Sequence, residues 1–142
     1  MASLLNVADL RKMLRKLGPD ALERAAKPAL ERVLAIVEAK AVELSPVDTG
    51  NLDASTVVTV ESATPGRVAG TVAFSTPYAL TQHEGIDPRT GQALMPGKRT
   101  QAKPGNEFGA AGPKFLERVL RGAHQFLPEA VVSLLRDAWR GL

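Results

Sequence analysis

The pair His83-Glu84 is the place where the residue types of this sequence could support enzyme chemistry. An imidazole and a carboxylate together can bind a metal ion or transfer protons. A zinc motif of the protease type needs a second histidine one helical turn further on, but position 87 is Asp87, and His124 lies in a separate predicted helix. We interpret the pair as helix-end residues that make local hydrogen bonds; the alternative is a metal-dependent hydrolase.

Other residue types that support catalysis lack the surroundings that the chemistry requires. The glycines between positions 85 and 112 form no GxGxxG pattern and no Gly-Lys-Ser/Thr pattern after a strand, so no phosphate loop is predicted. The serines lack the strand-to-helix context of a nucleophile elbow, and the chain contains no cysteine. We therefore predict no catalytic residue, no cofactor and no metal ion, and we expect that the protein is not an enzyme.

The length and composition predict an ordinary globular protein. A chain of 142 residues is expected to form one domain, residues 1–142, with its own hydrophobic core. Hydrophobic residues make up 44% and charged residues 23% of the chain, and no apolar run reaches the length of a membrane span. Residues 1–10 lack the pattern of a secretory signal. We therefore expect no membrane association.

The charge of the chain is mildly basic, with a formal net charge of +3. One predicted helix face carries Arg11, Lys12, Arg15 and Lys16 against the single acid Asp9. We interpret this face as solvated surface; the alternative is an anion site, which would make the chain a small basic nucleic-acid-binding or regulatory protein. Aromatic residues make up only 4% of the chain, which excludes the stacking platform of a single-strand binder.

The first half of the chain is predicted to be two helices followed by a hairpin. Apolar residues at helical spacing predict one helix over residues 6–17 and a long one over 19–44. Pro28 predicts either a kink or a fresh start within the long helix. Strands are predicted at 55–61 and 67–74, joined by a tight turn that contains proline and glycine. A lone hairpin is unstable in water, so it must pack on the long helix or gain strands from elsewhere.

The second half is predicted to contain short helices and one long loop. A helical turn is expected from Pro77 to the stop at Gly85, and two further helices are expected to start at Pro113 and Pro128. Residues 86–112 are rich in glycine and proline and have hardly any hydrophobic period, which predicts a flexible functional loop. We interpret this loop as a basic arm that orders only in an assembly. Its candidate contacts to a DNA channel or a partner are Arg89, Lys98, Arg99 and Lys103.

The order of these segments resembles the small tail-completion proteins of long-tailed bacteriophages, also called minor capsid or tail-component proteins. That family typically has a Pro-Val-Asp-Thr-Gly-x-Leu signature before the hairpin and a Tyr-Ala-x-x-x-Glu-x-Gly signature after it. Both signatures stand in this chain, the second with His83 inserted next to the acid. Asp53 and Thr56 stand where the family usually has a basic residue and an aromatic one. The matching residues are Pro46, Val47, Asp48, Thr49, Gly50, Leu52, Tyr78, Ala79, Glu84 and Gly85.

The resemblance implies an α+β fold like that of tail terminators, in which a long N-terminal helix packs on a small antiparallel sheet with C-terminal helices. It implies a structural virion protein of the head-tail neck or the tail, made in the host cytoplasm. Its expected partners are further copies in a ring that is commonly a hexamer, and the neighbouring stopper or adaptor, terminator and tail-tube proteins. Genomic DNA would pass through the ring without sequence-specific contacts.

Overall fold

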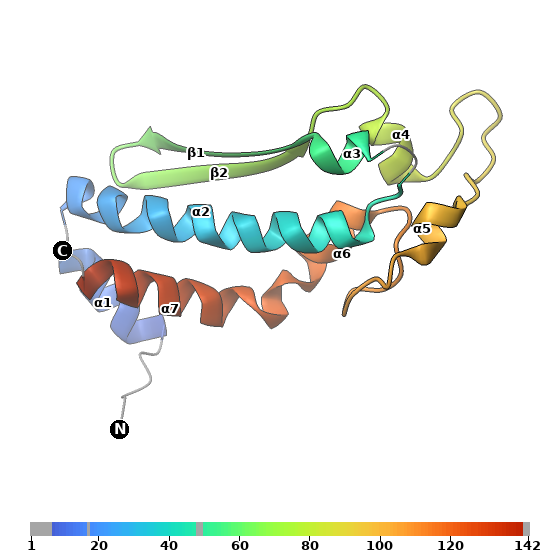
Figure 1. Cartoon of the computed structure of the whole chain (residues 1–142). Coiled ribbons are helices and arrows are strands. Elements are labelled where there is room, and N and C mark those ends of the chain that lie inside the picture. The colour runs from blue at the N-terminus through green and yellow to red at the C-terminus, as the bar shows by residue number, and fades with distance from the viewer. Residues whose placement is uncertain (1–6, 17, 48–49, 141–142) are drawn as a thin grey trace.

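Helix α2, Pro19–Leu44, is the longest element of the fold, and the two strands and the C-terminal helices pack against it (Figure 1). The computed structural model describes residues 7–16, 18–47 and 50–140. The buried stripe of α2 recurs every three or four residues, at Ala25, Ala29, Val33, Val37, Ala41 and Leu44, as an amphipathic helix requires.

The predicted long helix is confirmed, but the fresh start at Pro28 is wrong because α2 continues through this residue. Proline has no N–H, so the carbonyl of Arg24, four residues earlier, lacks its usual helical donor. Pro28 and Arg24 are both exposed. Water can therefore bind the carbonyl oxygen that the proline leaves without its helical partner.

The predicted hairpin is present and covers one face of α2. Strand β1, Thr56–Thr64, pairs antiparallel with β2, Arg67–Phe74, and its register places Val58 opposite Val72. Gly70 lies so close to α2 that a Cβ atom there would be 2.4 Å from Leu34 Cδ1. Glycine at this position therefore sets how closely the sheet approaches the helix. At the turn, Gly66 has φ 78°, which suits glycine after Pro65.

The C-terminal helices lie on the side of α2 opposite the hairpin (Figure 1). Helix α6, Phe115–Gly122, is followed by the 3-10 turn η1, Ala123–Gln125, and by α7, Leu127–Arg140. Helix α1, Val7–Lys16, lies at the end of α2 where that helix begins. The first of the predicted C-terminal helices begins two residues after Pro113, because Lys114 has a left-handed backbone with φ 58°.

The core lies between the C-terminal half of α2, the hairpin and α6. It contains Val37, Ala41, Leu44, Leu52, Phe115 and Val119. The ring of Phe74 meets that of Phe115 edge to face at a centroid distance of 4.9 Å. This contact joins the end of the hairpin to the start of α6.

Short elements gather at the end of the molecule where α2 finishes (Figure 1). These are α3, Asn51–Ala54, α4, Ala79–Glu84, and α5, Lys98–Ala102. Helix α4 starts two residues later than the expected start at Pro77, but it ends at Gly85 as predicted. The segment expected to be a loop, 86–112, contains α5 and two isolated β-bridges. Its mobility stays a prediction.

Candidate functional site

The two sequence motifs meet at this end of the molecule and line one groove. The groove has a volume of about 530 Å³. The motif residues in its lining are Pro46, Val47, Gly50, Leu52, Tyr78 and Gly85. Asp48 and Thr49 lie outside the described residues. Segments that are about thirty residues apart in the sequence thus form one surface.

The first motif turns the chain from α2 into α3. Ser45 ends α2 immediately before Pro46, as expected for a residue that precedes proline. Gly50 has a left-handed backbone with φ 87°, and its carbonyl accepts the first bond of α3, from the Ala54 N–H at 3.1 Å. Leu52 is only 4% exposed and packs in the core. The proline, glycine and leucine of the motif therefore stop one helix, reverse the chain and anchor the next.

The second motif forms α4 and its end. Ala79 packs against the core, whereas Tyr78 lies in the groove and is 41% exposed. Gly85 has φ 69°, and a Cβ atom there would be 2.6 Å from Pro113 Cβ. Both the backbone angle and this close approach require glycine.

Glu84 binds the start of α6 through Lys114. The Lys114 Nζ atom donates a hydrogen bond of 2.7 Å to Glu84 Oε2. This bond lowers the pKa of Glu84 below its ordinary value of 4.5 and raises the pKa of Lys114 above 10.5. The Lys114 N–H also donates to the His83 carbonyl at 2.6 Å. The acid of the second motif therefore fixes α4 against α6.

His83 makes hydrogen bonds at a helix end, as predicted, but one of them reaches across to α6. Its Nε2 atom accepts from the Glu117 N–H at 3.2 Å, in the first turn of α6, and its Nδ1 atom lies 3.5 Å from Glu84 Oε1. Its ring meets Phe115 edge to face at 5.0 Å. The Nε2 lone pair is occupied by a backbone donor, so this histidine acts as a cap for α6. Among the described residues there is no group of three or more metal-ligating side chains.

A polar cluster beside the groove was missed by the sequence reasoning. Lys103 Nζ donates to Asp53 Oδ2 at 3.0 Å, to the Ser45 carbonyl at 2.8 Å and to the Val42 carbonyl at 2.5 Å. Ser45 Oγ hydrogen-bonds Asp53 and lies 3.2 Å from Lys103 Nζ. Serine, lysine and aspartate can form a hydrolytic site, but Ser45 is 0% exposed and no substrate can reach it. The cluster instead satisfies the carbonyl end of α2.

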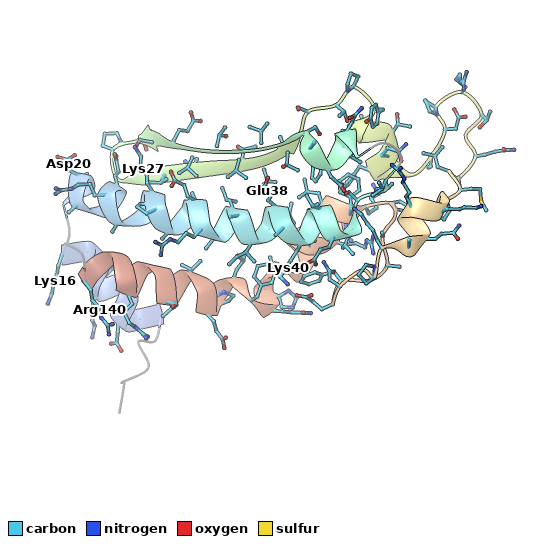
Figure 2. All side chains as sticks on the ribbon, in the orientation of Figure 1. Lys16, Asp20, Lys27, Glu38, Lys40 and Arg140 are labelled. Carbon is cyan, nitrogen blue, oxygen red and sulfur yellow. The ribbon has the colours of Figure 1, made fainter. Side chains whose placement is uncertain are left out.

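The segment 103–112 continues this capping of α2. Asn106 Nδ2 donates to the Lys40 carbonyl at 3.0 Å, and the Gly112 N–H donates to the Leu44 carbonyl at 2.8 Å. Lys40 forms an ion pair with Glu107, and Figure 2 shows Lys40 on the side of α2 that faces away from the hairpin. Leu44 is one of the last four residues of α2, whose carbonyls have no i+4 donor within the helix and carry partial negative charge, whereas Asn106 adds a donor to the Lys40 carbonyl just before them. The sequence therefore shows that the end of α2 needs donors, but it does not show which residues supply them.

The four predicted contact residues differ in their surroundings. The Arg89 side chain is 90% exposed, with Nε 3.8 Å from Asp87 Oδ1. Lys98 and Arg99, at the start of α5, are also exposed. Lys103 is turned inward, its side chain is 18% exposed, and its ammonium is occupied by protein atoms. None of the helices in the described parts of the chain is both long and apolar enough to cross a membrane.

The chain matches the HK97-gp10-like family, described as "Bacteriophage HK97-gp10, putative tail-component", over residues 8–80. The match covers about half of the chain and includes the first motif and the start of the second. No curated protein and no solved structure matches the chain. The chain belongs to this family of phage tail components, which gives it a structural role in the virion.

Proposed function

We propose that the protein completes the phage tail or joins the head to the tail, as repeated copies around the passage for DNA in the neck. Family membership over residues 8–80 carries this proposal. The copies form a ring, commonly a hexamer, with the stopper or adaptor, the terminator and the tail tube as neighbours. The protein is made in the host cytoplasm and has no catalytic role.

The groove lined by the two motifs is the proposed docking site for a neighbouring neck or tail protein. Its lining combines apolar residues, among them Val47 and Tyr78, with Met95, which is 88% exposed. Concave apolar surfaces with exposed large side chains are typical of protein contacts. Replacement of Tyr78 and Met95 by serine should leave the fold intact, because neither residue is buried, and should reduce attachment to the neighbour.

Arg89, Lys98 and Arg99 are the proposed DNA contacts, because they are exposed on the segment 86–112. Contacts to a translocating duplex must be weak, so each copy contributes few charges and repetition around the ring strengthens them. Neutralised phosphates release counterions, so the slope of log affinity against log salt is about −0.9 for each contact. The variant with all three residues changed to alanine should lose about three of these contacts.

Deletion of the coding sequence from the phage or prophage that carries it tests the assignment. Expected products are filled heads and tails that are not joined, or tails of abnormal length, and infectious particles return when the chain is supplied in trans. Mass spectrometry of purified virions should detect the chain in several copies. Normal infectious particles from the deletion, with the chain absent from wild-type virions, would overturn the proposal.

The hydrolase alternative is tested at His83. Because this side chain caps α6, His83→Asn should cost about 1 kcal/mol of stability and leave particle assembly nearly intact. Elemental analysis of the purified protein provides the second measurement. One tightly bound zinc ion per chain, lost in this variant, would favour an enzyme.

A second candidate function is that of a small basic nucleic-acid-binding protein. Its specific support is α1, which has four basic residues and one acid and thus carries a charge equal to that of the whole chain. Lys12, Arg15 and Lys16 are exposed, and Figure 2 shows Lys16 at the same end of the molecule as Arg140. Titrations with duplex DNA at two salt concentrations separate the two functions. Sequence-selective binding that survives physiological salt and is lost when the α1 cations become alanine would favour this second function.

A further inference from the structure

The two strands of the hairpin each have an open edge. Strands β1 and β2 form a two-stranded sheet, and in the described parts of the chain no third strand pairs with either. Natural proteins protect open edges with lysine, proline or β-bulges. Neither β1 nor β2 contains lysine or proline, and the register shift lies between Ser62 and Thr64, next to the turn. Away from the turn, the hairpin therefore offers two unprotected rows of backbone donors and acceptors.

We propose that a second copy of this chain covers these edges, with β1 of one copy paired antiparallel to β2 of the next. This inference rests on the proposed function, in which several copies surround the DNA passage, and it names the surface that joins them. Within one copy β1 and β2 run in opposite directions. Copies related by rotation about a common axis therefore bring β2 against an antiparallel β1 at every junction. The same head-to-tail contact repeats until the ring closes.

Charges on the two strands favour this head-to-tail pairing. Glu61 on β1 and Arg67 on β2 are both exposed, and no ion pair of either residue is present within the described part of one copy. Glu61 lies opposite Ala69 in the hairpin register, and Arg67 is two residues from Ala69 on the same face of the sheet. The proposal gives the junction the same register as the hairpin, and this register places Glu61 diagonally across from the neighbour's equivalent of Arg67, within reach of long side chains.

Two symmetric pairings are the competing arrangements. A β1–β1 or β2–β2 contact would join two copies into a closed dimer and leave the other edge of each hairpin open. It would also bring together strands that carry charge of one sign. Head-to-tail pairing covers both edges and places opposite charges across the junction.

Cross-linking between single-cysteine variants tests the pairing directly, because the chain has no cysteine of its own. Thr59 and Thr71 are exposed residues of β1 and β2 that lie opposite each other in the hairpin. Thr59→Cys and Thr71→Cys proteins are mixed at millimolar concentration and joined with a short bismaleimide, and Ser133→Cys on α7 serves as the control for random collision. The expected main product joins one Thr59→Cys chain to one Thr71→Cys chain. Products within one variant only, or a mixed product no more abundant than the control, would overturn the proposal.

Charge reversal gives an independent measurement by sedimentation of the same proteins. Glu61→Arg and Arg67→Glu should each weaken self-association about 2- to 10-fold, and the double variant should restore it. Glu31→Arg, on an exposed position of α2, is the matched control and should leave association unchanged. Equal effects of Glu31→Arg and Glu61→Arg would contradict the charge pairing. Virions that still incorporate the chain despite a failed cross-link would refute the strand pairing and leave the proposed function standing.

Discussion

Removal of the Lys103 ammonium should destabilise the protein strongly, although the sequence predicted that this lysine lies on a basic arm and contacts DNA or a partner. In Lys103→Met the apolar stem remains, so the loss comes from the charged bonds alone. The Val42 carbonyl keeps the Ser45 backbone N–H as a donor, at 3.3 Å, but the Ser45 carbonyl and Asp53 lose a charged partner. Lys103 is only 18% exposed, so water replaces these bonds poorly.

The expected cost follows from the charged bonds that disappear. A hydrogen bond to a charged group contributes about 1.5–3 kcal/mol, and a cation at a helix C-terminus contributes roughly 0.3–1 kcal/mol. These terms overlap at one ammonium, so we expect a loss of about 2–3 kcal/mol. For a chain of this length that corresponds to a decrease in Tm of roughly 6–12 °C.

Thermal and urea denaturation of Lys103→Met measure this loss, with Lys98→Met as the matched control in the same segment. Lys98 is exposed at the start of α5, so its replacement should change stability by less than about 0.5 kcal/mol. A double-mutant cycle with Asp53→Asn should give a coupling of about 1 kcal/mol. Equal effects of the two lysine variants would refute the assignment of Lys103 as the cap of α2.

Three further outcomes are expected. Gly70→Ala should cost about 1–3 kcal/mol in urea denaturation because it overpacks the contact with α2, whereas Gly97→Ala, which meets open space, should be nearly neutral. Folding lowers the pKa of Glu84, so the stabilisation from this residue is complete above pH 4.5 and is lost as the pH falls through the lower pKa of the folded state. Folding raises the pKa of Lys114, so its stabilisation is lost as the pH rises beyond 10.5. The Tm difference between wild type and Glu84→Gln should therefore vanish in acid, and a difference that persists there would contradict the pairing. Trypsin should first cut within 86–112, and early cuts confined to the termini would contradict the mobility predicted for this segment.

Local pattern was sufficient to predict the long helix and the hairpin. The apolar spacing of α2 and the Val/Thr content of the strands are repeated signals, and each agrees with the packing that the structure has. Pro28 was a strong local signal against a continuous helix, but it lies on the exposed side of α2, where water can bind the carbonyl that it leaves without a donor, and the helix continues. The late start of α6 depends on the bonds of Lys114 to Glu84 and to the His83 carbonyl, which are tertiary contacts that a periodic pattern does not contain.

The segment 86–112 shows where sequence pattern is insufficient. Its composition predicts a loop, and its basic residues all look alike in the sequence. Lys103 differs from Lys98 because the carbonyl end of α2 lies within reach of its ammonium, and that proximity depends on the path of the whole chain. The exposure of the side chain thus distinguishes Lys103, which caps α2, from Lys98, which remains a candidate DNA contact.

The position of the groove, by contrast, follows from chain order alone. The first motif ends where β1 begins, and the second begins shortly after β2 ends. An antiparallel hairpin of nearly equal strands returns the chain to the end from which it started, so the two motifs must lie close together. The hairpin therefore has two roles in this protein. Its ends bring the two motifs together, and its outer edges stay open along the length of α2. The contact proposed at the groove and the contact proposed at the edges therefore use separate surfaces, so the two proposals do not compete for the same residues.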